Sequence, residues 1–233
     1  MAYIEDIVVP VAWTTIDDRN NTLYMALDNH GIYSFRTLTM PNGNYTGATF
    51  ATEFQTQMNI ALAGLPTIIT VDHQHMDNIL TINTTDERPI ASAPLVLILI
   101  GHDDLKRGVF GTTINNTRTL NNVLRVDKSL HIGSFAKIQI DLHTTRNLYL
   151  TSSSLASYNC VSNFGNDTII KKIPVKASYN EMLIHEGGSG FDYLDVSKRS
   201  LRYIDFKLVD SYFNTIELRG NHLSFSIIFQ QQH

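Results

Sequence analysis

The chain has 233 residues and a mass of 26.3 kDa, with 43% hydrophobic and 17% charged residues, which excludes a disordered chain and a coiled coil. Its net charge of −4 and the lack of a long basic run argue against a general nucleic-acid-binding protein, which needs many cations on one face. The single Cys160 excludes an internal disulfide bond and a zinc site built from several cysteines.

The N-terminal segment 1–19 has a weaker hydrophobic pattern than the rest of the chain. We expect it to form an N-terminal arm. Glu5 and Asp6 stand where a signal peptide carries positive charge, so no such peptide is expected. The longest apolar run, Ala93–Ile100, has eight residues, whereas a membrane-spanning helix needs about twenty.

From Asn21 onward, short segments of alternating apolar and polar residues follow one another, separated by turn residues. This period of two is typical of strands that bury one face of a sheet. The expected strands are Asn21–Leu27, Gly31–Thr39, Thr67–Val71, Ile79–Asn83, Leu95–Ile100, Ala136–Leu142, Asn147–Thr151, Thr168–Val175, Glu181–His185, Leu201–Val209, Thr215–Leu218 and His222–Phe229.

One stretch, about 46–62, has the pattern of an amphipathic helix, because its apolar residues recur at intervals of three or four. These residues are Phe50, Phe54, Met58 and Ala61 or Leu62. Thr46 is suited to cap the helix N-terminus, and Gly64 and Pro66 are suited to end it. A shorter helical turn is expected to follow His102.

About a dozen short strands with one substantial helix predict an all-β protein. The simplest architecture is a single jelly-roll β-sandwich with one amphipathic helix at about 46–62. The sequence contains no internal repeat and no linker rich in proline, glycine or serine. We therefore expect one jelly-roll domain over residues 20–233, preceded by the arm of residues 1–19.

Two histidine clusters in the sequence are candidate metal-binding or catalytic sites. His73 and His75 are two residues apart, so on a strand both could ligate one metal ion. No third ligand is identifiable, and two solvated histidines in a loop are the favoured interpretation. His102 precedes Asp103 and Asp104, and here the favoured interpretation is a pair of acids that complement the dipole of a short helix.

Two other groups fall short of a catalytic motif. His185–Gly190 lacks the second histidine of a zinc-protease helix, and Phe191 stands where a nucleophile elbow centred on Ser189 needs glycine. Cys160 would need an adjacent histidine to act as a nucleophile, so a small buried thiol is favoured. We expect no enzyme, no catalytic residue, no cofactor and no metal site.

Two stretches resemble known virus proteins. Residues Tyr33–Thr46 form a strand and a turn that lead into the expected helix, as in structural proteins of DNA viruses and virophages. The segments Leu201–Asp210 and Asn214–Phe229 look like a closing hairpin. Such a hairpin resembles the C-terminal end of penton-type minor capsid proteins of virophages and related DNA viruses, which are similar in architecture to the adenovirus penton base.

The resemblance implies a viral structural protein, a single jelly roll that forms homopentamers at icosahedral vertices. The implied partners are further copies of the chain and neighbouring major capsid protein capsomers, with no specific nucleic acid and no transmembrane insertion. The implied location is the capsid vertex of the virion, after assembly inside the host cell. The integrin-binding Arg-Gly-Asp loop of the adenovirus protein is not implied, because Asn221 follows Arg219 and Gly220.

Two other functions stay open on the sequence. One is a trimeric β-sandwich head that binds a receptor or a glycan through exposed aromatic residues in loops. Its candidate residues are Tyr158, Phe164, Phe191 and Tyr193. The other is a hydrolase or metal enzyme. Its candidate residues are His73, His75, His102 and His185.

Overall fold

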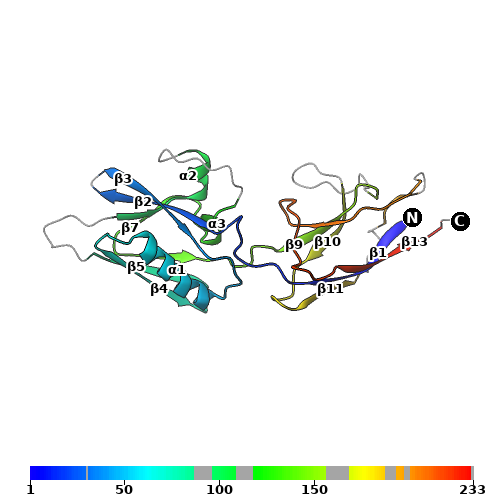
Figure 1. Ribbon diagram of the computed structural model, residues 1–233, viewed down its shortest axis with the longest axis horizontal. Helices are drawn as coiled ribbons and strands as arrows, with labels where there is room; N and C mark the ends of the chain where they lie inside the picture. Colours follow the sequence, from blue (N-terminus) through cyan, green and yellow to red (C-terminus); the bar gives the residue numbers. More distant parts are fainter. Residues whose placement is uncertain are drawn as a thin grey trace. The chain divides into compact units, whose positions relative to one another are not determined.

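The chain divides into two compact units in the computed structural model (Figure 1). The structure describes residues 1–29, 31–86, 96–108, 118–155, 168–186, 193–196 and 200–231. Unit 1 consists of Met1–Trp13 and Thr145–His233, and unit 2 consists of Thr14–Thr144. Unit 2 is therefore inserted into the sequence of unit 1, between its first and second strands.

Unit 1 contains two three-stranded antiparallel sheets. In spatial order, the strands of the first sheet are β11 (Met182–Glu186), β1 (Ala2–Pro10) and β13 (Ser224–Phe229). Those of the second are β10 (Ile169–Pro174), β9 (Asn147–Thr151) and β12 (Lys207–Val209). Buried side chains from both sheets form a single hydrophobic cluster, so unit 1 is a β-sandwich with one core.

β1 is the middle strand of its sheet, and the expected arm of residues 1–19 is therefore wrong. Its inward side chains, at most 2% exposed, are Ala2, Ile4, Ile7 and Val9. A β-bulge between Ile4 and Asp6 shifts the inward positions from even to odd residue numbers. This shift breaks the period of two in the sequence, which is why the strand was not recognised.

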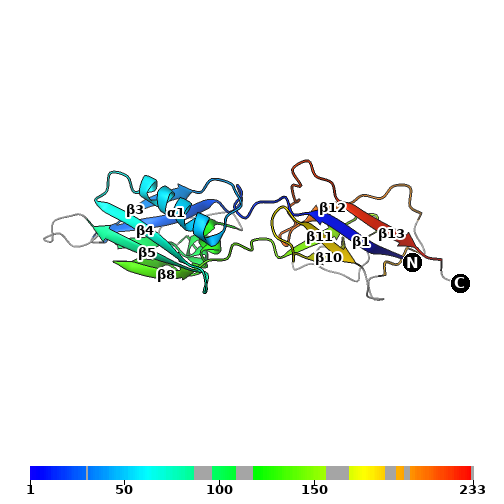
Figure 2. The same ribbon diagram turned by 90° about the horizontal axis from the view of Figure 1, so that it is seen from below.

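Pairing of β1 with β13 also joins the two ends of the chain, as the views in Figure 1 and Figure 2 agree. The Met1 amino group donates a hydrogen bond to the Gln230 carbonyl at 2.8 Å, and the Gln230 amide donates to the Met1 carbonyl at 2.8 Å. The first sheet of unit 1 therefore requires pairing between the first and the last strand of the chain.

The expectation of one domain over residues 20–233 is also wrong. The chain leaves unit 1 after Trp13, forms unit 2, and returns to unit 1 at Thr145. Neither boundary lies in a segment with the composition of a linker. Within unit 2, the Thr144 hydroxyl donates to the Thr15 carbonyl at 3.2 Å, which joins the two segments where the chain begins and ends that unit. Hydrogen bonds of this kind leave no signal in the sequence.

The expected closing hairpin is also different in the structure. β12 pairs with β9, whereas β13 pairs with β1, so the two strands belong to different sheets. Of the expected strand Leu201–Val209 only the last three residues are regular, and Thr215 makes a single bridge to Val209. Among the described residues β13 is an edge strand of its sheet, and β1 occupies the centre.

Unit 2 has two antiparallel sheets around a core of its own. One sheet has the order β3 (Ile32–Thr39), β2 (Thr22–Asn29), β6 (Val96–Leu99) and β7 (Leu130–Ile132). The other has the order β4 (Thr67–Gln74), β5 (Ile79–Asp86) and β8 (Phe135–Gln139). The helices are α1 (Gly47–Ala61), α2 (His102–Lys106) and α3 (Leu120–Val123).

The amphipathic helix is confirmed as α1. Thr46 is its N-cap, and the Thr46 hydroxyl accepts a hydrogen bond from the Thr49 amide, which satisfies a donor of the first turn. Phe50, Phe54 and Met58 are fully buried in the core of unit 2. The all-β class with one substantial helix therefore agrees with the expectation from the sequence.

α1 also covers the edge of β4. The Asn59 carboxamide accepts a hydrogen bond from the Ile69 amide and donates one to the Ile69 carbonyl, each at 2.9 Å. The Gln55 side-chain oxygen accepts from the Val71 amide at 2.7 Å. The helix side chains thereby take the place of a neighbouring strand, and this removes an edge that could pair with other chains.

The substitution Asn59→Ala should destabilise unit 2 by about 2 kcal/mol, because it leaves two partly buried backbone groups of Ile69 without their partner. Urea unfolding measures the loss. Gln57→Ala is the matched control, since the Gln57 amide bonds to Glu53 within the helix. Equal losses in the two variants would contradict the proposed role of Asn59.

The substitution Ile7→Ala should destabilise unit 1 by about 3 kcal/mol, because it empties a fully buried position of the central strand. Glu5→Ala, at the exposed bulge of the same strand, should change the free energy of unfolding by less than about 0.5 kcal/mol. Thermal unfolding compares the two variants. An Ile7 variant as stable as the wild type would mean that β1 is not part of the folded sheet.

Candidate functional site

The outer face of the β11–β1–β13 sheet differs from an ordinary solvent-facing surface. Strand register places these residues on it, opposite the buried positions Ile7, Val9 and Leu183. They are Tyr3, Asp6, Val8 and Pro10 from β1, Met182, Ile184 and Glu186 from β11, and Ser224, Ser226 and Ile228 from β13. We call this set the acidic apolar face.

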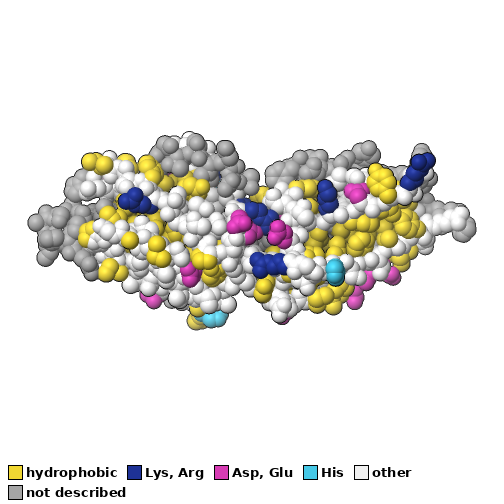
Figure 3. All heavy atoms as spheres, viewed as in Figure 1, with side chains coloured by type: hydrophobic (Ala, Val, Ile, Leu, Met, Phe, Trp, Pro, Cys, Tyr) yellow, Lys and Arg dark blue, Asp and Glu magenta, His cyan; other side chains and the backbone are white. Residues whose placement is uncertain are grey.

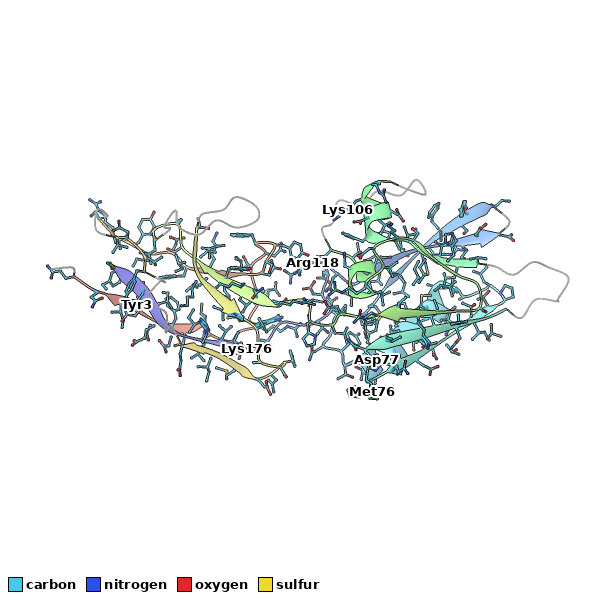
Figure 4. The ribbon with its side chains drawn as sticks, turned by 180° about the vertical axis from the view of Figure 1, so that it is seen from behind. Tyr3, Met76, Asp77, Lys106, Arg118 and Lys176 are labelled. Atoms are coloured by element: carbon cyan, nitrogen blue, oxygen red, sulfur yellow. The ribbon has the colours of Figure 1, made fainter. Side chains whose placement is uncertain are left out.

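Large apolar side chains are exposed on the acidic apolar face. Ile184 is 63% exposed and Met182 is 54% exposed, and they lie beside Val8 and Pro10 of the neighbouring strand. Tyr3, labelled in Figure 4, packs edge-to-face against Tyr193 with ring centroids 5.4 Å apart. Figure 3 sees unit 1 from the edge of its sandwich, and shows further hydrophobic side chains gathered there beside β13. An antiparallel sheet with a solvated face usually carries polar residues there.

Unit 2 shows what a solvated sheet face looks like in this chain. The outer face of β4–β5–β8 is mostly polar, with Ile68 and Phe135 as exposed exceptions at one end. Its polar residues are Thr70, Asp72, Gln74, Thr81, Asn83, Thr85, Lys137 and Gln139. The contrast between the two sheets marks the acidic apolar face as a surface suited to contact with another molecule.

Two carboxylates lie in the middle of the acidic apolar face. Asp6 and Glu186 are directly opposite each other on β1 and β11. The Asp6 Oδ1 atom is buried and has no hydrogen-bond donor among the described residues. This chain already covers that oxygen, so a group from another molecule does not reach it. Glu186 is exposed and is therefore the carboxylate of this pair that a partner can contact.

The second sheet of unit 1 carries basic residues on its outer face. Lys172 aligns with Tyr149 and Lys207 aligns with Thr151, and both lysines are exposed. Thr151 and Val209 lie on the same face and are buried, so the exposed part of this face is at its lysines. Leu148 alternates with these positions and points into the core. We call this the basic face. Since the two sheets enclose one core, the acidic apolar face and the basic face lie on opposite sides of the sandwich.

Asp205 fixes the segment that leads into β12. Its carboxylate accepts hydrogen bonds from the backbone amides of Ser153 and Ser154, both at 3.0 Å, and from their hydroxyls at 2.8 and 2.6 Å. These bonds, led by that from the Ser154 hydroxyl, hold the pKa of Asp205 well below its usual range. They attach residue 205 to the turn after β9, so the ladder with β9 begins only at Lys207.

Among the described residues, no third ligand lies close enough to His73 and His75 to complete a metal site. His73 belongs to β4, not to a loop, and its Nε2 atom is 3.1 Å from the Asn78 side-chain oxygen. Asn78 in turn donates to the Ile140 carbonyl at 2.8 Å, so this histidine helps to hold the turn between β4 and β5. Figure 4 labels Met76 and Asp77 in that turn. The two imidazole centroids are 6.2 Å apart.

His102 is a buried histidine at the start of α2. Its Nδ1 atom lies 3.3 Å from the Thr119 hydroxyl, and burial lowers its pKa. Asp103 and Asp104 lie in the first turn of α2, as the dipole interpretation expects. Asp104 also accepts hydrogen bonds from the Ser129 amide and hydroxyl, at 2.9 and 2.7 Å. The cluster therefore joins α2 to the chain before β7.

The remaining sequence candidates are only partly described. His185 lies in β11 next to the acidic apolar face, and Tyr193 packs on Tyr3. The candidates Cys160, Ser189, Tyr158, Phe164 and Phe191 lie outside the described residues. In the part of the chain that the structure describes, no group of three or more His, Cys, Asp or Glu side chains could hold a metal ion. No helix of these residues is long and apolar enough to cross a membrane.

Sequence reasoning missed both faces of unit 1. Asp6 falls in the expected arm of residues 1–19, and Lys172 falls in an expected strand, Thr168–Val175, with no role predicted for it. One signal was present: Met182 and Ile184 alternate with Leu183 in a strand whose two faces are both apolar, although a strand at a solvated surface should have one polar face. The sequence could not predict that Asp6 and Glu186 lie opposite each other, because their alignment depends on the register between two strands that are far apart in the sequence.

Comparison with solved structures finds a likeness to a virus protein. No family model matches the sequence, and no curated protein matches it. The crystal structure of the mavirus penton protein is similar to this chain, with a TM-score of 0.54 and 9% sequence identity. The likeness covers 97% of this chain and 82% of the mavirus chain. It confirms the penton-type jelly-roll fold that the two sequence stretches indicated.

The substitution Asp205→Asn should destabilise unit 1 by about 2 kcal/mol at pH 7, since an amide cannot accept all four hydrogen bonds. The folded-state pKa lies below the unfolded value, so the stabilisation is present above pH about 4 and is lost on acidification. Urea unfolding at pH 7 and at low pH should therefore show a difference between wild type and variant that shrinks toward pH about 2.

The exposed Glu217→Gln is the matched control and should show no such dependence. A difference between wild type and the Asp205 variant that is the same at both pH values would contradict the assignment of the stabilisation to the ionised carboxylate.

Proposed function

We propose that this chain is a penton-type minor capsid protein that forms homopentamers at the vertices of an icosahedral virus capsid. The observation that carries the proposal is the structural likeness to the mavirus penton protein, which extends over nearly the whole chain and so includes both units. The proposed activity is assembly and not catalysis. The proposed location is the virion, after assembly inside the host cell.

A closed ring of five identical copies needs two different contact surfaces on each copy, because rotational symmetry other than twofold places unlike surfaces together. Unit 1 offers such surfaces on the two sides of one rigid sandwich. The rim of the ring would contact the neighbouring major capsid protein capsomers. The exposed apolar residues of the acidic apolar face support assembly, since a solvated sheet would gain nothing from them.

Light scattering of the purified chain tests the proposal. Five copies of the 26.3 kDa chain give 131.5 kDa, and we expect this mass together with five-fold symmetric rings in electron micrographs. Three copies would give 78.9 kDa, and a trimer would contradict the proposal and favour a receptor-binding head. A chain that stays monomeric at every concentration, with no higher species captured by cross-linking, would contradict it as well.

A further inference from the structure

The two outer faces of unit 1 are complementary in charge. We infer that the acidic apolar face of one copy binds the basic face of the next copy, and that this contact, repeated around the axis, forms the ring. The occupant of the acidic apolar face is thus a second copy of this chain. The inference rests on the proposed pentamer and names the surfaces that build it.

The first step is that the acidic apolar face is covered by another molecule. Met182 and Ile184 are more than half exposed and lie on one face of β11, next to Val8 and Pro10. Covering exposed apolar side chains removes apolar surface from water, so these neighbouring residues favour association. The outer face of β4–β5–β8 is mostly polar by comparison, with exposed apolar residues only at one end.

The acidic apolar face does not bind the acidic apolar face of another copy. A twofold contact would bring Asp6 and Glu186 of one copy against Asp6 and Glu186 of the other. Carboxylates brought together in one dry contact repel one another and weaken the association. The exposed Glu186 carboxylate is instead suited to contact a cation on the partner.

The third step identifies the donor. Lys172 and Lys207 are exposed on the outer face of the other sheet of the same sandwich. A lysine ammonium carries three donors and no acceptor, so it can pair with the exposed Glu186 carboxylate. When the acidic apolar face of each copy binds the basic face of the next, every copy is related to its neighbour by the same rotation. Such a heterologous contact closes into a ring when the rotation fits.

Charge reversal on each face tests the inference. Glu186→Lys and Lys172→Glu should each raise the concentration at which half of the protein is pentameric by at least about tenfold, because each places like charges in every contact of the ring. The double variant Glu186→Lys/Lys172→Glu exchanges the two charges and should recover most of the lost assembly. Light scattering against concentration measures all three variants and the wild type.

Mixing the two single variants gives an independent readout. At each contact between unlike variants, the introduced lysine of one meets the introduced glutamate of the other, or the native pair is retained. The mixture should therefore associate better than either variant alone. A ring of five cannot alternate two kinds of subunit, so the mixture should give fewer closed pentamers than the double variant.

Matched controls are available on the polar face of unit 2. Asp72→Lys and Lys137→Glu reverse charges at exposed strand positions and should leave assembly within about twofold of the wild type. Circular dichroism and thermal unfolding of all variants check that the fold is retained.

Two results would overturn the inference. If the wild type is pentameric and both single variants assemble as the wild type does, the pentamer stands but its surfaces are elsewhere. If Glu186→Lys alone weakens assembly and the double variant shows no recovery, Lys172 is not the partner. A wild-type trimer would instead contradict the proposed function itself, so the two failures are distinguishable.

Discussion

The double pairing of β1 is the constraint on which the rest of unit 1 depends. One nine-residue strand pairs with β11 on one side and with β13 on the other, and it contributes four of the buried side chains of the core. The bulge after Ile4 lets its two halves face the same core although their inward positions differ in parity. Because β1 comes first and β13 comes last, the sandwich of unit 1 is built from two segments of the sequence that lie on either side of unit 2.

The sequence could predict those elements whose pattern is local. Most strands from β2 to β11 could be predicted, and β4 and β8 show why, because each buries one face and so keeps a period of two. α1 was found with its cap, because Thr46 and the spacing of Phe50 and Phe54 are both local signals. The strand β1 could not be predicted from the sequence, because a bulge interrupts its alternation. The short length of β12 could not be predicted either, because it follows from hydrogen bonds that Ser153 and Ser154 donate to Asp205.

The two units deal with exposed sheet surface in different ways. In unit 2, Asn59 and Gln55 of α1 occupy the edge of β4, and the outer face of that sheet is mostly polar. In unit 1, the acidic apolar face keeps the large apolar side chains of Met182 and Ile184 exposed. Apolar surface that is unfavourable in an isolated chain becomes stabilising when another copy covers it.

The proposed ring contact places Lys172 of one copy against Glu186 of the next, and carbodiimide cross-linking tests this most directly. The reagent joins a carboxylate to an amine only where the two are in contact, and a mixture of isotopically light and heavy chains identifies links between copies by mass spectrometry. We expect a link between light and heavy chains from Lys172 to Glu186. Pentamers that yield inter-copy links elsewhere, and none at these residues, would contradict it.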